Sequence, residues 1–147
     1  MKLESQDGSC FELEILGYQF PQTVGDRFDS NWLLIKYSIT NSKGTWTATD
    51  PCMLTSEVAE LAIWLDKVSS GEKYQSEFAF MEPEIEFLCT QNETGEEVLR
   101  VYIHSEYAIP PTMVELWVEF LLDSVDFGGV ANNLRRQLEK FPERPGI

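Results

Sequence analysis

Hydrophobic and polar residues alternate near the start of the chain in the way that predicts β-strands. In one segment the apolar residues Phe11, Leu13 and Ile15 occupy every second position, and glutamates lie between them. This period of two is typical of a strand that buries one face. An apolar run at 32–39 is followed by a polar connection at 41–44 and a β-branched run at 45–49. We therefore predict an antiparallel hairpin that ends at Asp50-Pro51.

Two later segments repeat their apolar residues at helical spacing. The first contains Val58, Leu61, Ala62, Leu65 and Val68, and the second contains Phe127, Val130, Ala131, Leu134, Leu138 and Phe141. Each predicts an amphipathic helix that buries one side. Thr55 or Ser56 is expected to cap the first helix, which stops at Ser69-Ser70-Gly71. Asp126 is expected to open the second helix, and Pro142 to end it.

Four further strands are predicted between the helices. They cover residues 74–81, 85–89, 98–106 and 114–122. A turn at 92–95 implies another hairpin. The order of strands, helix, strands and helix lacks the regular alternation of a doubly wound sheet. We therefore predict an α+β fold, with a largely antiparallel β-sheet and two amphipathic helices packed on it, as a single domain over residues 1–147.

Length and composition fit a protein with a substantial core. The chain has 147 residues, of which 43% are hydrophobic, and a chain of this size can bury roughly 68–70% of its unfolded surface. Its first residues lack the apolar run of a secretory signal, and no segment has the length of a membrane span. We expect a soluble, cytoplasmic protein. Cys10, Cys52 and Cys89 are widely spaced, which favours free thiols over disulfides or a zinc site.

Negative charge is concentrated in one part of the sequence. The net charge is −14, and residues 74–123 contain eleven acidic residues against the single base Arg100. Such a surface repels phosphate backbones, so direct nucleic-acid binding is not expected. The charge favours a basic protein partner instead. A negative surface that only confers solubility is the alternative.

The sequence shows no catalytic motif. It has no glycine-rich phosphate loop, no nucleophile elbow and no cluster of metal ligands, so we predict no catalytic residue, metal or cofactor. His104 is the only histidine. The pairs Glu84 with Glu86 and Glu115 with Glu119 are each expected on one strand face, where two carboxylates can serve a weak hydrolase. However, glutamates that alternate with apolar residues are also typical of a solvated sheet face, which we favour.

One combination of side chains on the predicted outward faces suggests a binding surface. The residues of one strand face are Arg100, Tyr102 and His104. On another strand, Trp117 lies between Glu115 and Glu119. Arginine and aromatic residues are enriched at the energetic centres of protein interfaces. The alternative is that Trp117 lies under a helix or loop.

Several short blocks of the chain resemble those of the WapI-family immunity proteins, which are bacterial antidotes paired with polymorphic or contact-dependent toxins. The blocks are residues 14–21 (EILGYQFP), 29–33 (DSNWL), 46–55 (WTATDPCMLT) and 80–83 (FMEP), with Pro110-Pro111 and the closing Phe141-Pro142. None of them is a catalytic motif. Asn31-Trp32 and Asp50-Pro51 also have a structural interpretation as turns with a core aromatic.

The resemblance implies neutralisation of a cognate toxin domain by tight binding. The implied partner is the C-terminal domain of a secreted or surface toxin, and a nuclease fits best because its basic cleft complements an acidic inhibitor. From the residues themselves, the first acidic candidates for the contact are Glu84, Glu86, Glu115 and Glu119, with Arg100, Tyr102 and Trp117 as anchors and His104 beside them. Two alternatives stay open: a small-ligand module with an apolar pocket bordered by Tyr and Trp, and the weak hydrolase.

Overall fold

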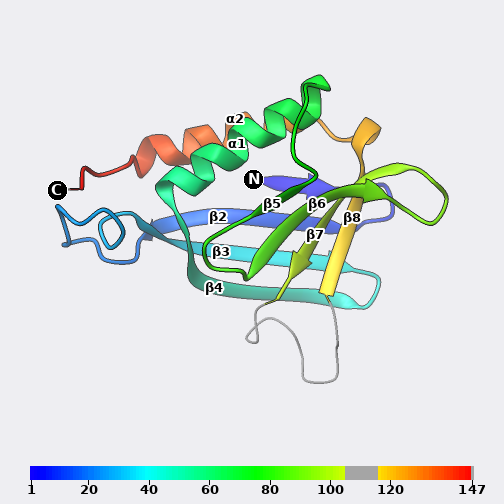
Figure 1. Cartoon of the computed structure of the whole chain (residues 1–147). Coiled ribbons are helices and arrows are strands. Elements are labelled where there is room, and N and C mark those ends of the chain that lie inside the picture. The colour runs from blue at the N-terminus through cyan, green and yellow to red at the C-terminus, as the bar shows by residue number, and fades with distance from the viewer. Residues whose placement is uncertain (105–115, 147) are drawn as a thin grey trace.

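The computed structural model describes residues 1–104 and 116–146. Within those residues the chain forms two antiparallel four-stranded sheets and two α-helices (Figure 1). The first sheet contains β1 (Lys2–Glu4), β2 (Cys10–Tyr18), β3 (Trp32–Asn41) and β4 (Gly44–Leu54), and the second contains β5 (Glu77–Ala79), β6 (Ile85–Gln91), β7 (Glu97–Ile103) and β8 (Leu116–Leu121). Helix α1 (Thr55–Ser70) connects the sheets, and a short 3-10 turn (Leu122–Ser124) leads to α2 (Phe127–Lys140).

The predicted α+β class is confirmed, with the strands divided between two sheets. In each sheet the neighbours in space are also neighbours along the chain, as in simple antiparallel meanders. The chain leaves the first sheet directly into α1, and the next four strands pair only with one another. The two helices pack side by side and lie over one face of the first sheet (Figure 1).

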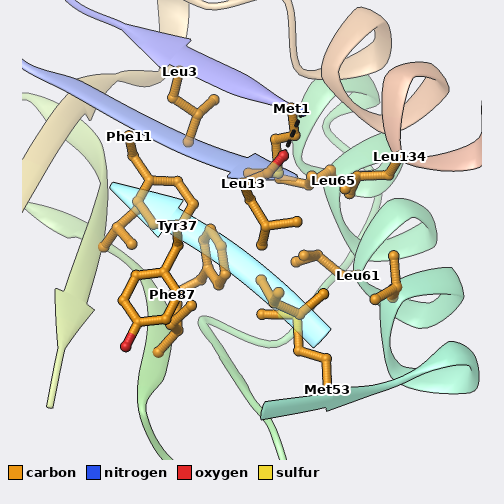
Figure 2. Close-up of a cluster of buried hydrophobic side chains, with 14 of the residues drawn as sticks. Met1, Leu3, Phe11, Leu13, Tyr37, Met53, Leu61, Leu65, Phe87 and Leu134 are labelled. Atoms are coloured by element: carbon orange, nitrogen blue, oxygen red, sulfur yellow. Dashed lines mark hydrogen bonds between the residues drawn. The ribbon is translucent and has the colours of Figure 1, made fainter. Parts of the chain in front are cut away.

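One contiguous core joins both sheets and both helices. The predicted inward positions of β2, Phe11, Leu13 and Ile15, are all buried. Figure 2 shows Phe87 of β6 beside Phe11 and Tyr37, whereas residues of the helices lie around Leu13. The Phe11 and Phe87 rings meet edge to face, with centroids 5.8 Å apart, a favoured aromatic geometry. The helices therefore cover one part of the inner face, and the second sheet covers the other.

Strand β4 continues past the point where the hairpin was expected to end. Asp50 pairs with Ile35, and after an irregularity in the register Met53 pairs with Leu33. Pro51 lies within this irregularity of an edge strand, where its missing N–H costs no regular ladder bond. The prediction that Asp50-Pro51 ends the hairpin is therefore wrong.

The start of α1 also differs from the expectation. Its N-cap is Leu54, and Glu57 in the first turn accepts the backbone N–H of Leu54 at 2.9 Å and that of Met81 at 2.6 Å. Thr55 is the first helical residue, and its buried hydroxyl donates to Asn31 Oδ1. Thr55 and Ser56 are therefore not the cap. The predicted start of α2 is confirmed, because the Asp126 side chain accepts the N–H of Gly129 at 3.0 Å.

The strands of the second sheet differ in length from the predicted segments, and β6 extends to Gln91, beyond the predicted 85–89. Strand β5 covers Glu77–Ala79 of the predicted 74–81, and Tyr74 instead packs edge-on against Trp64 of α1. For the predicted strands 98–106 and 114–122, residues 105–115 lie outside the described part of the chain. The described remainder forms β7 and β8.

Helix α2 covers the open edge of β2. Strand β1 pairs with only the first part of β2. Beyond it, Gln137 of α2 accepts the N–H of Ile15 at 2.8 Å and donates to the carbonyl of Leu13 at 3.3 Å. The Met1 amino group also donates to the Leu13 carbonyl, at 2.8 Å (Figure 2). These bonds pair edge groups that would otherwise be open to another strand.

A buried asparagine ties the 19–31 loop to α1 and to the segment after α2. Asn31 is 3% exposed. Its Nδ2 donates to the carbonyls of Arg27 at 3.1 Å and Arg144 at 2.8 Å. Its Oδ1 accepts from the Thr55 hydroxyl at 3.2 Å and the Arg144 N–H at 2.7 Å. One amide side chain therefore joins three segments that are far apart in the sequence.

Arg144 completes this junction from the other side. Its guanidinium donates to the carbonyls of Ser30 at 2.6 Å, Pro21 at 3.0 Å and Phe20 at 3.0 Å. It also stacks over the Tyr18 ring, 3.8 Å from the centroid. We call Asn31, Arg144 and the groups that they bind the tail junction.

We predict that Asn31→Ala lowers the free energy of unfolding by about 2–4 kcal/mol, because it leaves several buried backbone groups without partners. Urea unfolding of the purified protein measures the change. Gln22→Ala is the control, since Gln22 is an exposed residue of the same loop. Equal stability of the two variants would contradict a stabilising role for the junction.

Candidate protein-interaction site

Strand register brings most of the predicted site residues to one face. Across the second sheet, Glu86, Tyr102 and Trp117 are direct neighbours on β6, β7 and β8. Arg100 and Glu119 are neighbours one pleat further along. The intervening residues of β7 and β8, among them Val101, Ile103 and Val118, are buried in the core. Because side chains alternate along a strand, the candidates point away from that core.

Arg100 is the centre of this surface. Its Nε and Nη2 donate to Glu119 Oε2 at 3.2 and 3.0 Å, and its Nη1 donates to the Tyr102 hydroxyl at 3.1 Å. The guanidinium also lies 4.4 Å from the centroid of the Trp117 ring. The hydrogen bond with Tyr102 and the interaction with Glu119 raise the pKa of Arg100. This side chain is therefore a fixed cation whose charge is balanced by Glu119.

Tyr102 links Arg100 to a second pair. The rings of Tyr102 and His104 stack, with centroids 6.0 Å apart and planes 4° apart. His104 Nε2 lies 3.2 Å from Glu86 Oε2. Tyr102 also contacts Trp117, at 6.3 Å between centroids. We call Glu86, Arg100, Tyr102, His104, Trp117 and Glu119 the sheet-2 surface.

Two of the predicted residues do not join this group. Glu115 lies outside the described residues. Glu84 precedes β6, and its carbonyl accepts the N–H of His104 at 2.8 Å, but its side chain is oriented differently. Its Oε2 is buried and has no hydrogen-bond partner in the described structure. Burial raises the pKa of Glu84, and the nearby carboxylates of Glu82 and Asp50 raise it further.

Trp117 is open to solvent. It is 37% exposed, and within the described residues its ring contacts are those with Arg100 and Tyr102. This geometry favours the surface interpretation of Trp117 over its packing under a helix or loop. The two carboxylates nearest to it in the group are already paired, Glu119 with Arg100 and Glu86 with His104.

The sequence interpretation missed the turn between β6 and β7 as part of the site. A cleft of about 650 Å³ lies beside Trp117, lined by Gln91, Asn92, Glu93, Thr94, Arg100, Trp117 and Glu119. Asn92 Oδ1 accepts the N–H groups of Thr94 at 3.0 Å and Glu96 at 2.9 Å, which fixes the turn. The predicted turn at 92–95 was the available signal. Only the folded structure shows that the turn lines the same cleft as Arg100 and Trp117.

A second cleft bears on the small-ligand alternative. It has a volume of about 450 Å³, lies between α1 and the segment leading into β5, and is lined partly by Ile63, Trp64, Tyr74 and Phe78. The Trp64 N–H already donates to the Gln75 carbonyl at 2.8 Å. Trp64 is also almost fully buried. Its role in packing is therefore clear, and the ligand interpretation stays an alternative.

The three cysteines are free thiols. Cys52 is fully buried, and burial raises its pKa far above the ordinary range. Burial also raises the pKa of Cys89 to about 11 and, to a smaller extent, that of Cys10. A thiol with a raised pKa is a weak nucleophile at neutral pH. The described residues contain no group of three or more His, Cys, Asp or Glu side chains placed to hold a metal ion.

A protein-family comparison matches the Immunity protein WapI-like family over residues 2–142. The chain belongs to the WapI-like immunity protein family. The resemblance inferred from the short sequence blocks is thereby confirmed. No curated protein and no solved structure matches the chain. Among the described residues of this WapI-like protein, no helix is both long and apolar enough to span a membrane.

Several of the blocks behind the resemblance meet at the tail junction. Asn31 comes from residues 29–33, Thr55 ends residues 46–55, and Tyr18 belongs to residues 14–21. The Tyr18 hydroxyl donates to the Pro142 carbonyl. In this WapI-like protein these residues hold the frame together, and the sheet-2 surface consists of other residues.

Glu84 gives a pH-dependent prediction. Its pKa in the folded protein lies above the ordinary value of 4.5. Between the pKa of Glu84 in the unfolded chain and its higher pKa in the folded protein, the unfolded chain releases the Glu84 proton first. The free energy of unfolding therefore falls as pH rises through this range. Glu84→Gln should therefore raise the free energy of unfolding near pH 7 relative to the original protein, with a smaller difference near pH 4. Urea unfolding at both pH values is the test, and Glu60→Gln on the exposed side of α1 is the charge-matched control. A Glu84→Gln effect that does not change with pH would contradict this origin.

Proposed function

We propose that this protein neutralises a cognate toxin domain by binding it through the sheet-2 surface. The observation that carries the proposal is the linked group of Arg100, Tyr102, His104 and Trp117, which faces solvent on one sheet. Family membership supports an antidote role in general. Binding, with no chemical step, accounts for this group without a catalytic motif.

The composition of the surface suits a tight contact. Arginine and aromatic side chains dominate the binding energy of many interfaces. Here Glu119 and Tyr102 hold Arg100 in place, and Trp117 lies against it. Side chains that are already ordered lose little conformational entropy when a partner binds. The surface is therefore prepared for binding in the free protein.

We propose a basic partner, most simply a nuclease domain at the C-terminal end of a secreted or surface toxin. The net charge of −14 supports this choice. A nuclease presents a positive cleft to its phosphate substrate, and opposite charge accelerates encounter. The carboxylates of Glu86 and Glu119 are paired within the surface. Their proposed role is to orient His104 and Arg100 as well as to contribute charge.

We predict that Trp117→Ala weakens binding of the toxin domain by about tenfold to a hundredfold, because it removes an exposed aromatic anchor from the centre of the surface. The measurement uses the C-terminal domain of the toxin encoded next to the gene for this chain. Titration calorimetry gives the affinity, and growth of cells that produce both proteins gives the protection.

Phe28→Ala is the matched control, because Phe28 is 43% exposed but lies in the 19–31 loop, outside the sheet-2 surface. It should bind and protect as the original protein does. Loss of binding in Phe28→Ala with full binding in Trp117→Ala would place the interface elsewhere. Absence of any binding by the original protein would contradict the proposed function itself.

A further inference from the structure

We infer that the cleft between the β6–β7 turn and Trp117 binds a lysine or arginine side chain of the toxin. This inference rests on the proposed function and specifies one contact within it. The cleft lies at the border of the sheet-2 surface, because Arg100, Trp117 and Glu119 form one of its walls. Gln91 at the end of β6 and the turn residues 92–94 form the other wall.

The cleft offers carboxylate oxygens to a cation. Glu119 uses only Oε2 to bind Arg100. In the described structure, no hydrogen bond is made by its Oε1. Glu93 on the opposite wall is exposed and has no ion pair with a described residue. A side chain that enters between these walls therefore finds two negatively charged groups, one of them without a counter-ion.

Arg100 does not cancel this preference. The charged residues that line the cleft are two acids and one base, Glu93, Glu119 and Arg100, so one negative charge remains in excess. Glu96 adds a further carboxylate at the same turn, and hydrogen bonds from Thr94 and Asn92 lower its pKa. The lowered pKa keeps Glu96 ionised at neutral pH, so it adds negative charge next to the cleft.

Trp117 supplies the apolar part of the contact. A cation over an indole ring is stabilised by the ring electrons, and more strongly when water is excluded. The long stem of a lysine or arginine also packs well against an aromatic surface. More than a third of Trp117 is exposed before binding (37%). An acidic side chain of the partner gains neither contribution.

The walls are held in place before the partner arrives. Asn92 accepts three hydrogen bonds from the turn, from the N–H groups of Thr94 and Glu96 and from the Thr94 hydroxyl. Arg100 is fixed by Glu119 and Tyr102 on the other side. The width of the cleft is therefore set by the free protein.

Glu93→Gln tests this inference, because it removes the uncompensated charge and keeps the size of the side chain. Glu139→Gln is the matched control, since it removes the same charge from an exposed position on α2. Binding of the same toxin domain is measured by titration calorimetry at low and at high salt. Circular dichroism checks that each variant is folded.

We expect Glu93→Gln to weaken binding by about fivefold to tenfold at low salt, and less at high salt, as for a partly exposed charged contact. Glu93→Lys should weaken it by about a hundredfold, because it places a second cation in the cleft. Glu139→Gln should change affinity by less than about twofold.

Equal effects of Glu93→Gln and Glu139→Gln would overturn the inference, because only the total charge would then matter. Unchanged binding by Glu93→Lys would overturn it as well. In both cases binding by the original protein would leave the proposed function standing. If the original protein does not bind the toxin domain, the proposed function fails, and the inference fails with it.

Discussion

Burial of the inner face of the second sheet is the constraint on which the site depends. Phe87 packs edge to face against Phe11 of the first sheet, and the inward residues of β7 and β8 join the same core. Once these positions are buried, the pleat directs the residues between them outward. Arg100, Tyr102 and Trp117 therefore share one solvent-facing surface as a direct result of core packing. The apolar residues position the polar ones.

Much of the fold was predictable because it follows from local patterns. The period-two run at Phe11, the helical spacing of both helices and the cap at Asp126 each depend on residues close in sequence. The errors at Pro51 and Thr55 have a different origin. Pro51 is tolerated by a register irregularity in β4, and the Thr55 hydroxyl binds Asn31, more than twenty positions away. No local pattern contains those contacts.

Most members of the candidate surface were predictable, but the ion pairs within it were not, and Glu84 does not join it. Alternation along two strands indicated that Arg100, Tyr102 and His104 lie near Trp117. In the structure Arg100 and Tyr102 contact Trp117, and His104 stacks on Tyr102. The sequence did not indicate that Glu86 and Glu119 are paired with His104 and Arg100, because pairing depends on register between strands. The cleft that the β6–β7 turn shares with Trp117 is likewise a feature of the folded structure. A count of acidic residues therefore did not reveal that Arg100 balances the charge of Glu119, and it overlooked Glu93 at the turn.

The tail junction determines which side chains of the 19–31 loop can be substituted without loss of structure. Asn31 and Arg144 bind mainly main-chain groups: the carbonyls of Phe20, Pro21, Arg27, Ser30 and Arg144 and the N–H of Arg144. Main-chain groups are present whatever side chain a residue carries. The outward-pointing side chains of the 19–31 loop, such as Val24, which is 76% exposed, are thus free to diverge without loosening the attachment of the loop.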